Sequence, residues 1–299
     1  MSNYSHVHED SRKHFELSDH DRMYVCLHDI WIKHPNAERL INSIHFSLKM
    51  TNRITSPCML CVAPGGAGKT AVITELKTRN IFSEYKMLFV TMHINPNNYS
   101  LRDLILVEMG LGVGRRARQG ENLTPEMQNL IKFQKIRGIV IDEVHDALYL
   151  TSTQQSQNLS LLKNLSSQIY GLSVFAFGIP KAARVLRHDA QVRRRYAVRS
   201  LARWENGDEY RNFVASYINR LPLKKPTNYK DQALFIKIFE KSLGITDNIV
   251  KILQTSAAAA VVDGCECITH FHIDNIEALM EVVNLSLRDL DEEDSYDSD

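Results

Sequence analysis

Long apolar runs, paired cysteines and a strong net charge are all missing from this sequence. None of its 299 residues belongs to a run approaching the roughly 18 apolar residues of a membrane span, so we expect no membrane contact. The first 16 residues are charged where a signal peptide needs its apolar region, which predicts a cytoplasmic protein. Five cysteines, an odd number in a reducing compartment, predict free thiols. The remaining class is a soluble globular protein of about two domains.

The net charge of +1 hides an uneven distribution. Residues 289–299 carry seven carboxylates and no Lys or Arg, which leaves the rest of the chain at about +8. A positively charged protein of this kind favours a polyanionic partner, although a charge of this modest size does not by itself identify the partner. The acidic tail has too little apolar surface to fold, and we expect it to be disordered.

Residues 59–70, MLCVAPGGAGKT, run from an apolar strand into a glycine-rich loop that ends in Lys-Thr. In such a loop backbone N–H groups converge on nucleotide phosphates, the lysine reaches the same oxygens and the Thr hydroxyl ligates Mg²⁺. The following helix, about residues 69–79, directs its positive end at the nucleotide. Ala63 replaces the first glycine of the G-x-x-x-x-G-K-[ST] pattern, so the leading turn must accommodate a methyl group. The pattern predicts a P-loop NTPase; the alternative is a chance glycine-rich turn or a dead nucleotide site.

The predicted nucleotide-binding residues form one continuous stretch. They are Ala63, Pro64, Gly65, Gly66, Ala67, Gly68, Lys69, Thr70 and Ala71.

Strands alternate with helices through the middle of the chain, which predicts a five-stranded parallel α/β sheet with helices on both faces. We expect the strands at residues 58–62, 86–93, 138–141, 172–177 and 196–201. The helices between them are expected at residues 100–111, with Ser100 as N-cap, 125–134, 151–170 and 180–188.

The two ends of the chain differ from this middle region. Residues 1–20 are polar, rich in histidine and without periodicity, so we expect no regular structure there. Two amphipathic helices follow, at about residues 23–31 and 37–48. Beyond Pro222 only helices are expected, at residues 233–242, 245–254 and 273–287, with an alanine-rich turn at 257–260.

Residues 139–143, IVIDE, form an apolar strand that ends in two acids. Phosphoryl transfer requires a protein mainly to position the water and stabilise charge. We therefore expect Asp142 beside Mg²⁺ and Glu143 as the base or the group that orients the attacking water. The alternative is a strand with a solvated acidic end, but a P-loop about 75 residues upstream favours the catalytic interpretation.

These features together resemble an AAA+ ATPase, with a P-loop, an acidic strand end, a fourth strand, an Arg-rich helix end and a helical lid. More narrowly, the chain resembles the TniB/TnsC transposition ATPases over about residues 20–285. The P-loop and Asp-Glu motifs are common to the superfamily, so the narrower assignment depends on WI-x-H-P and G-x-P-x-A-A. The matching segments are residues 31–35 (WIKHP), 141–145 (IDEVH), 177–183 (FGIPKAA), Trp204 with 221–223 (LPL), and 264–269.

The resemblance implies an ATP- and Mg²⁺-dependent, DNA-binding regulator of transposition. Such proteins assemble as rings or helical filaments of their own copies on double-stranded target DNA. They receive a TniQ-type target selector, which in some systems is linked to a CRISPR effector complex, and recruit a TnsB/TniA-type transposase. Two alternatives stay open: a generic AAA+ replication initiator or loader, and a nucleotide-gated scaffold with negligible hydrolysis.

The same resemblance implies a domain division. Residues 1–52 would be an N-terminal tail with a helical extension and 53–222 the AAA+ nucleotide-binding domain. Residues 223–288 would form the helical lid, followed by the acidic tail at 289–299.

Two positions depart from the AAA+ pattern. Ile179 follows the fourth strand, where AAA+ proteins usually place a polar sensor residue. Residues 244–248, GITDN, lack the arginine that many AAA+ lids present to the γ-phosphate. We therefore expect slow hydrolysis, which suits a protein whose ATP-bound state is the signal.

Two groups of arginines are candidates for contacts with phosphates. Arg194 or Arg195, in the basic run before the fifth strand, is expected to be the finger that reaches a neighbouring subunit's γ-phosphate; the alternative is a solvated helix end. A pore-lining face is expected to contact DNA phosphates without reading sequence, unless it is an ordinary surface loop. The residues predicted for it are Arg102, Arg115, Arg116 and Arg118.

Three further features carry weaker signals. Cys58 and Cys61 point to different faces of a strand, which predicts core packing rather than chelation. Residues 265–272, CECITHFH, have zinc-like residue types but a spacing that fits no standard site. Trp31 is either a core residue or a cover over the adenine.

Overall fold

The computed structural model describes residues 4–92, 99–112, 125–148 and 150–289, in two compact units. The sheet unit comprises residues 36–65 and 69–202, and the helical unit comprises the described residues up to 35, 66–68 and those from 203 onward. Within the described residues no helix is both long and apolar enough to cross a membrane. All five cysteines are free, as predicted.

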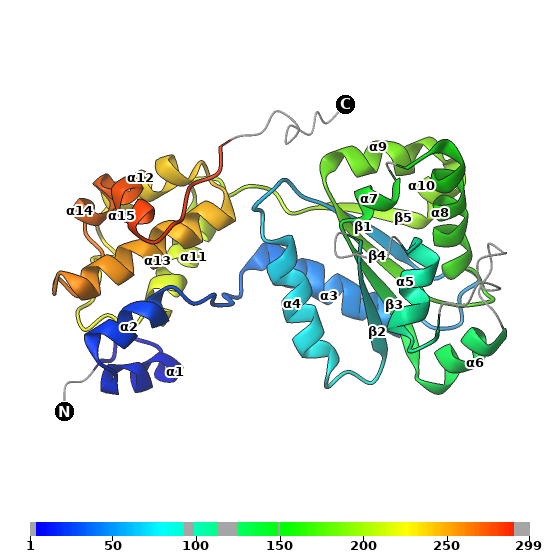
Figure 1. Cartoon of the computed structure of the whole chain (residues 1–299), viewed down its shortest axis with the longest axis horizontal. Helices are drawn as coiled ribbons and strands as arrows, with labels where there is room; N and C mark the ends of the chain where they lie inside the picture. The colour runs from blue at the N-terminus through cyan, green and yellow to red at the C-terminus, as the bar shows by residue number, and fades with distance from the viewer. Residues whose placement is uncertain (1–3, 93–98, 113–124, 149, 290–299) are drawn as a thin grey trace. The chain divides into compact units, whose positions relative to one another are not determined.

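The sheet unit is built on five parallel strands in the order β2-β3-β4-β1-β5, which confirms the predicted fold class (Figure 1). Both β1 and β4 are buried along their whole length, because inner strands of a parallel sheet are covered on both faces. The predicted strands agree with the structure to within about two residues at each end. The strands are β1 (Cys58–Val62), β2 (Lys86–Thr91), β3 (Ile136–Asp142), β4 (Ser173–Gly178) and β5 (Tyr196–Ser200).

Helices cover both faces of this sheet; Figure 1 shows α3 and α4 on one side of the strands and α8 on the other. Ser100 caps the helix that follows β2, as predicted, because its Oγ accepts the Asp103 N–H while the Asp103 carboxylate accepts the Ser100 N–H. The helices are α3 (Pro35–Lys49), α4 (Lys69–Asn80), α5 (Leu101–Glu108), α6 (Pro125–Phe133), α7 (Val144–Leu148), α8 (Ser152–Leu165), α9 (Pro180–His188) and α10 (Ala190–Arg195).

The helical unit is organised around its longest helix, α13, which packs against α2, α11, α12, α14 and α15. The expected turn at residues 257–260 is wrong, because these alanines lie inside α13. Alanine is the best helix former, and small side chains let neighbouring helices approach closely; three of the four alanines are buried. The elements are α1 (Glu9–Arg12), the 3₁₀ helix η1 (Lys13–Glu16), α2 (Asp19–Cys26), α11 (Asp208–Arg220), α12 (Gln232–Ser242), α13 (Thr246–Val262), α14 (His270–Asp274) and α15 (Ile276–Val282).

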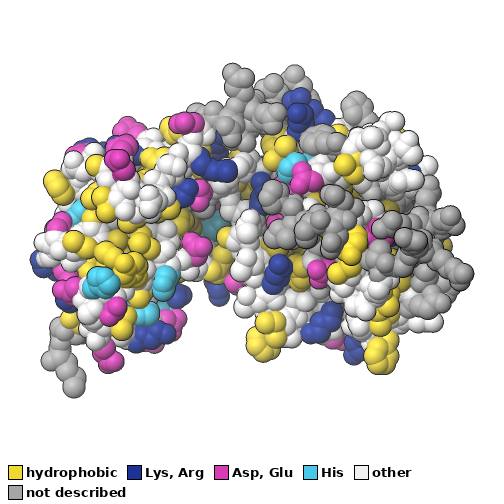
Figure 2. Space-filling view, in the orientation of Figure 1, with side chains coloured by type: hydrophobic (Ala, Val, Ile, Leu, Met, Phe, Trp, Pro, Cys, Tyr) yellow, Lys and Arg dark blue, Asp and Glu magenta, His cyan; other side chains and the backbone are white. Residues whose placement is uncertain are grey.

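The expectation of no regular structure in residues 1–20 is wrong for residues 4–20. This segment forms α1, η1 and the start of α2. Two hydrogen bonds join it to Asn219 at the end of α11. Asn219 donates from Nδ2 to the carbonyl of His6 at 2.7 Å, and its own carbonyl accepts the N–H of His8 at 2.9 Å. In Figure 2 several histidine side chains (cyan) gather on the helical unit. Tertiary hydrogen bonds of this kind leave no periodic pattern in a sequence.

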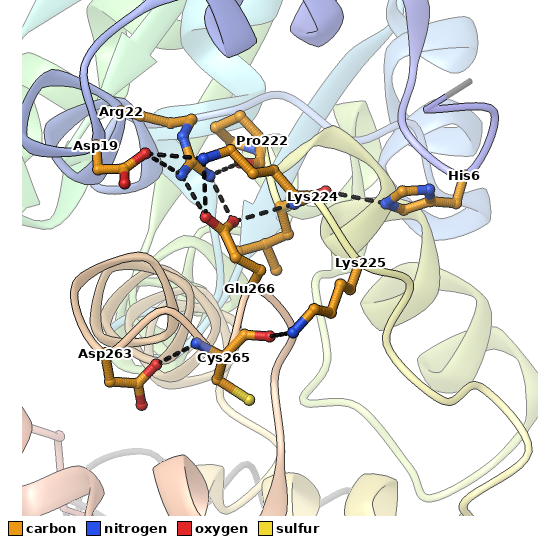
Figure 3. Close-up of polar contacts among 10 residues, drawn as sticks. His6, Asp19, Arg22, Pro222, Lys224, Lys225, Asp263, Cys265 and Glu266 are labelled. Atoms are coloured by element: carbon orange, nitrogen blue, oxygen red, sulfur yellow. Dashed lines mark hydrogen bonds and ion pairs between the residues drawn. The ribbon is translucent and has the colours of Figure 1, made fainter. Parts of the chain in front are cut away.

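Arg22 is the largest fully buried charged side chain among the described residues, and it joins α2 to the turn after α13 (Figure 3). Its guanidinium donates to Glu266 Oε2 at 2.6 Å, to Asp19 Oδ1 at 2.6 Å and to the carbonyl of Pro222 at 2.8 Å. Burial opposes ionisation of Glu266, but Arg22 and the N–H of Lys224 outweigh it and hold the pKa of Glu266 below its ordinary value. Arg22 and Glu266 therefore form an ion pair inside the helical unit.

Replacing Arg22 by Met is expected to lower the free energy of unfolding of the helical unit by roughly 3–5 kcal/mol, because Glu266 keeps a buried charge without its main partner. Urea unfolding followed by tryptophan fluorescence measures this unit selectively. Both tryptophans of the chain, Trp31 and Trp204, belong to it.

Lys237→Met is the matched control, because Lys237 makes its 2.7 Å ion pair with Asp274 on the surface and such pairs contribute only about 0–1 kcal/mol. The double variant Arg22→Met, Glu266→Gln should recover part of the loss. Equal effects of Arg22→Met and Lys237→Met would contradict the structural role given to Arg22. The depressed pKa of Glu266 also means that its contribution is complete above its unfolded pKa and is lost as the pH falls through the lower folded value.

Candidate nucleotide-binding site

The glycine-rich loop lies where β1 ends and α4 begins, at the carboxyl edge of the parallel sheet. Ligands of open α/β sheets bind at this edge. Gly66 and Gly68 have φ values of +74° and +94°, a backbone region that glycine adopts without strain. Both glycines are therefore required by the course of the loop.

Ala63, which replaces the first glycine of the pattern, extends the pairing of β1 with β4. Its N–H donates to the carbonyl of Gly178 at 3.0 Å, and its side chain is fully buried. Ala63 is not among the residues with a positive φ, so its methyl group is accommodated without backbone strain. The departure from the pattern leaves the loop intact.

Lys69 begins α4 and turns back over the loop. Its Nζ donates to the carbonyls of Ala63 at 3.0 Å and Pro64 at 3.3 Å, and only 8% of the residue is exposed. The ammonium is thereby held inside the curve of the loop, where phosphate oxygens bind in this type of site. Thr70 and Ala71 follow in the first turn of α4, with their side chains exposed.

Asp142 ends β3 and faces the same edge of the sheet. Burial and the neighbouring charge of Glu143 raise its pKa, while Lys69 and Lys77 act in the opposite direction. Lys69 therefore acts on Asp142 across the site, although 73 positions separate them in the sequence. A divalent cation would offset the repulsion between the two acids, and the hydroxyl of Thr70 with the carboxylate of Asp142 is a donor set that suits Mg²⁺.

Glu143 lies in the turn between β3 and α7, with a φ of +52°. Few residues other than glycine adopt this region, and such strain is concentrated at functional sites. One of its oxygens, Oε2, lies 3.0 Å from Nδ1 of His145. In the sequence, His145 was noted only as part of the IDEVH motif. Its contact with Glu143 could not be predicted, because it depends on the strained turn and no sequence pattern indicates it.

Gly178 and Ile179 occupy the end of β4, the position of the polar sensor in AAA+ proteins. A Cβ atom on Gly178 would lie 3.0 Å from Cγ1 of Val144 and 3.3 Å from Cβ of Ala182. The glycine thus lets α7 and α9 pack closely against the end of β4. Ile179 precedes α9 as its N-cap residue and makes no side-chain capping hydrogen bond.

The structure separates the two arginines predicted for the finger. Arg195 is used within the chain, because its guanidinium donates to the carbonyl of Lys163 at 2.6 Å and to Oγ of Ser166 at 3.1 Å. Arg194 is exposed on the last turn of α10, as is Arg193. Of the two predicted residues, Arg194 is therefore the more exposed one.

Of the predicted DNA contacts, only Arg102 falls within the described residues. It lies in the first turn of α5, half-buried, and its Nε has no hydrogen-bond partner among the described residues. Arg115, Arg116 and Arg118 lie outside the described residues.

The family-like motifs of the helical unit come together in one aromatic cluster. The ring of His34 lies 6.3 Å from Trp31 and 5.0 Å from Trp204, and Trp204 stacks on Phe213 at 4.7 Å. The indole N–H of Trp204 donates to Oγ1 of Thr246 at 3.1 Å. WI-x-H-P and Trp204 thus share one packing environment, which favours the core interpretation of Trp31.

The cysteine- and histidine-containing segment at residues 265–272 uses its imidazoles in pairwise contacts. His270 Nε2 lies 2.8 Å from Asp231, and the buried His272 lies 3.0 Å from Asp263. Among the described residues no three His, Cys, Asp or Glu side chains are placed to hold a metal ion. Cys58 and Cys61 are both buried in β1, in agreement with the predicted core packing.

Solved structures similar to this chain are P-loop ATPases at low sequence identity. A Walker-type ATPase of Pyrococcus abyssi has a TM-score of 0.55 at 11% identity, covering 85% of this chain and 75% of that one. Cdc6p of Pyrobaculum aerophilum has a TM-score of 0.57 at 15% identity, covering 80% of this chain and 66% of that one. The Orc1 protein of Aeropyrum pernix, solved in complex with DNA, has a TM-score of 0.57 at 17% identity, covering 89% of this chain and 72% of that one.

No curated protein sequence matches the chain. The family model of the bacterial TniB protein matches residues 22–206, more than half of its length. This match includes the P-loop, the Asp-Glu strand end, the segment after β4 and the Arg-rich end of α10. The chain has the fold of a Walker-type ATPase and belongs to the TniB family.

Proposed function

We propose that this protein binds and slowly hydrolyses ATP with Mg²⁺, and assembles with its own copies on double-stranded DNA to regulate DNA transposition. In this role it links a TniQ-type target selector to a TnsB/TniA-type transposase. The observation that carries the proposal is the convergence of Lys69, Asp142 and Glu143 at one sheet edge in a chain of the TniB family.

The chemistry is divided among the chain's own groups. Loop N–H groups and Lys69 bind the phosphates and neutralise charge that develops on the transferred group. Thr70 and Asp142 would hold Mg²⁺, which supplies further charge neutralisation when bound. Glu143 orients the attacking water and accepts its proton. Arg194 of a neighbouring copy supplies the remaining positive charge at the γ-phosphate, so that hydrolysis depends on assembly.

DNA association is supported by the basic residues of the sheet unit and by a similar protein. The Orc1 protein of Aeropyrum pernix was solved with DNA, and the half-buried Arg102 lies at the start of α5. We include Arg115, Arg116 and Arg118 in the same phosphate-binding surface. A generic AAA+ replication initiator or loader is the alternative enzymatic function, and a nucleotide-gated scaffold is the non-enzymatic one.

Lys69→Ala is expected to abolish nucleotide binding, because it removes the one cation held within the loop. Glu143→Gln is expected to bind ATP as wild type does and to lose turnover by a factor on the order of 10² or more, since only the water-activating carboxylate is lost. Binding of a fluorescent ATP analogue and release of phosphate, each with and without duplex DNA, measure the two steps separately. Equal, negligible turnover in wild type and Glu143→Gln would favour the scaffold.

Arg194→Ala is expected to lower turnover without lowering the melting temperature, whereas Arg195→Ala is expected to lower the melting temperature because Lys163 and Ser166 lose their partner. A mixture of Arg194→Ala with Lys69→Ala tests action between subunits. An interface is complete where an Arg194→Ala copy binds ATP and a Lys69→Ala copy offers Arg194, so random mixing restores roughly a quarter of the interfaces. Arg193→Ala is the matched control, and no recovery on mixing would place the finger elsewhere.

Mixed with duplex DNA and a non-hydrolysable ATP analogue, the chain is expected to form rings or helical filaments visible by electron microscopy. Arg102→Ala should weaken DNA binding equally for all sequences and reduce the slope of log K against log salt by about 0.9. Lys241→Ala, which removes a surface pair with Glu277 in the helical unit, is the control. Isolated monomers on DNA would contradict the proposed assembly.

A further inference from the structure

We propose that His145 is a positioning residue for Glu143: its imidazole holds one carboxylate oxygen and thereby directs the other toward the attacking water. This inference rests on the role of Glu143 proposed above. It concerns a residue that is neither part of the P-loop nor a ligand of the phosphates or of Mg²⁺.

The contact is made within a single sharp turn. Nδ1 of His145 lies 3.0 Å from Oε2 of Glu143, and both atoms are shielded from solvent. The left-handed backbone at Glu143, with φ at +52°, turns the chain from β3 into α7 and brings residues 143 and 145 to the same side. The strain of that turn is maintained by the surrounding packing, as expected where the conformation serves the site.

The imidazole is fixed because α7 itself is fixed. Val144, Ala147 and Leu148 of this short helix are completely buried, and α7 packs against α8, α9 and β4. Gly178 leaves room for Val144 at the end of β4, where a Cβ atom would lie only 3.0 Å from Cγ1 of Val144. His145 is only 19% exposed, and its other ring nitrogen, Nε2, lies 3.6 Å from the carboxylate of Asp146. The imidazole ring therefore cannot rotate freely, because each of its nitrogens lies near a carboxylate.

The groups around His145 shift its pKa in opposite directions. The contact with Glu143 raises the pKa of His145, burial lowers it, the charges of Glu143 and Asp146 raise it, and Lys69 lowers it. On the elements packed against α7, β4 carries no charged residue, α8 carries Lys163, and α9 carries Lys181, Arg184, Arg187 and His188. The net direction is upward, above the ordinary value of 6.5.

This electrostatic setting has a consequence for catalysis. A neutral imidazole that donates from Nδ1 orients Glu143 and leaves the second oxygen basic. A protonated imidazole withdraws electron density from the carboxylate and makes it a weaker base. Turnover should therefore rise as the pH increases through the raised pKa of His145.

Steady-state hydrolysis by the full chain, with ATP and Mg²⁺ varied and the pH scanned, tests the inference. His145→Ala is expected to lower kcat on the order of tenfold, because a displaced carboxylate no longer aligns the water, while KM stays within about twofold. In His145→Asn the amide nitrogen occupies the position of Nδ1. It is expected to restore most of the activity while the acidic limb of the kcat profile disappears, since an amide does not titrate.

His45→Asn is the matched control, because His45 is a half-buried histidine of α3 in the same unit and lies outside the site. It should leave kcat, KM and the pH profile unchanged. A kcat for His145→Ala equal to or above that of wild type would overturn the inference, as would a His145→Asn variant as slow as His145→Ala. If His145→Ala fails to fold, the pH profile of His145→Asn decides: an acidic limb identical to that of wild type overturns the inference.

Glu143→Gln separates this inference from the function on which it rests. Turnover of Glu143→Gln equal to wild type would refute the role of Glu143 itself. An inactive Glu143→Gln combined with a fully active His145→Ala would refute only the positioning by His145. In the Glu143→Gln background, replacing His145 should have no further effect on kcat, because the two residues act as one unit.

Discussion

The insertion of β1 between β4 and β5 is the constraint on which the site depends. Parallel strands end at a common edge, so this order places the P-loop after β1 beside the end of β4, with the end of β3 one strand further. The N–H of Ala63 donates to the carbonyl of Gly178, which continues the β1–β4 ladder into the loop. Groups that are more than 70 positions apart in the sequence, such as Lys69 and Asp142, thereby act on one another. Without this strand order the P-loop would be a phosphate-binding turn with no acids beside it.

The electrostatic balance of the edge follows from that convergence. Two adjacent carboxylates, Asp142 and Glu143, are partly buried and repel one another, which raises the pKa of Asp142. Each has a different compensating group: Lys69 acts on Asp142, whereas His145 contacts Glu143. Pairs of titratable groups whose environments differ in this way are typical of acid–base sites. In the proposed function the two carboxylates would have separate tasks, with Asp142 as a ligand of Mg²⁺ and Glu143 as the group that orients the water.

The strands, the P-loop and the acidic strand end were predictable from sequence because each has a local pattern: a short apolar run, a glycine spacing, or a pair of acids at a strand end. The regular structure of residues 4–20 could not be predicted, since it depends on hydrogen bonds to Asn219 and on the burial of Arg22 against Glu266. The alanines at residues 257–260 were predicted as a turn, but they lie inside α13. Their small side chains allow close helix packing. The contact of His145 with Glu143 was invisible for a third reason: it depends on a positive φ at a residue other than glycine.

The difference between Arg194 and Arg195 bears on how turnover is regulated. Arg195 holds the end of α8 through the carbonyl of Lys163, and in doing so it fixes the end of α10 on which Arg194 is exposed. A fixed helix end with an exposed arginine suits a group that is proposed to act on another copy's nucleotide. Ile179 stands where AAA+ proteins usually place a polar sensor, and residues 244–248, GITDN, carry no arginine. In the proposed function, Lys69 supplies positive charge from within the chain and Arg194 of a neighbouring copy would add to it, which would make hydrolysis depend on assembly.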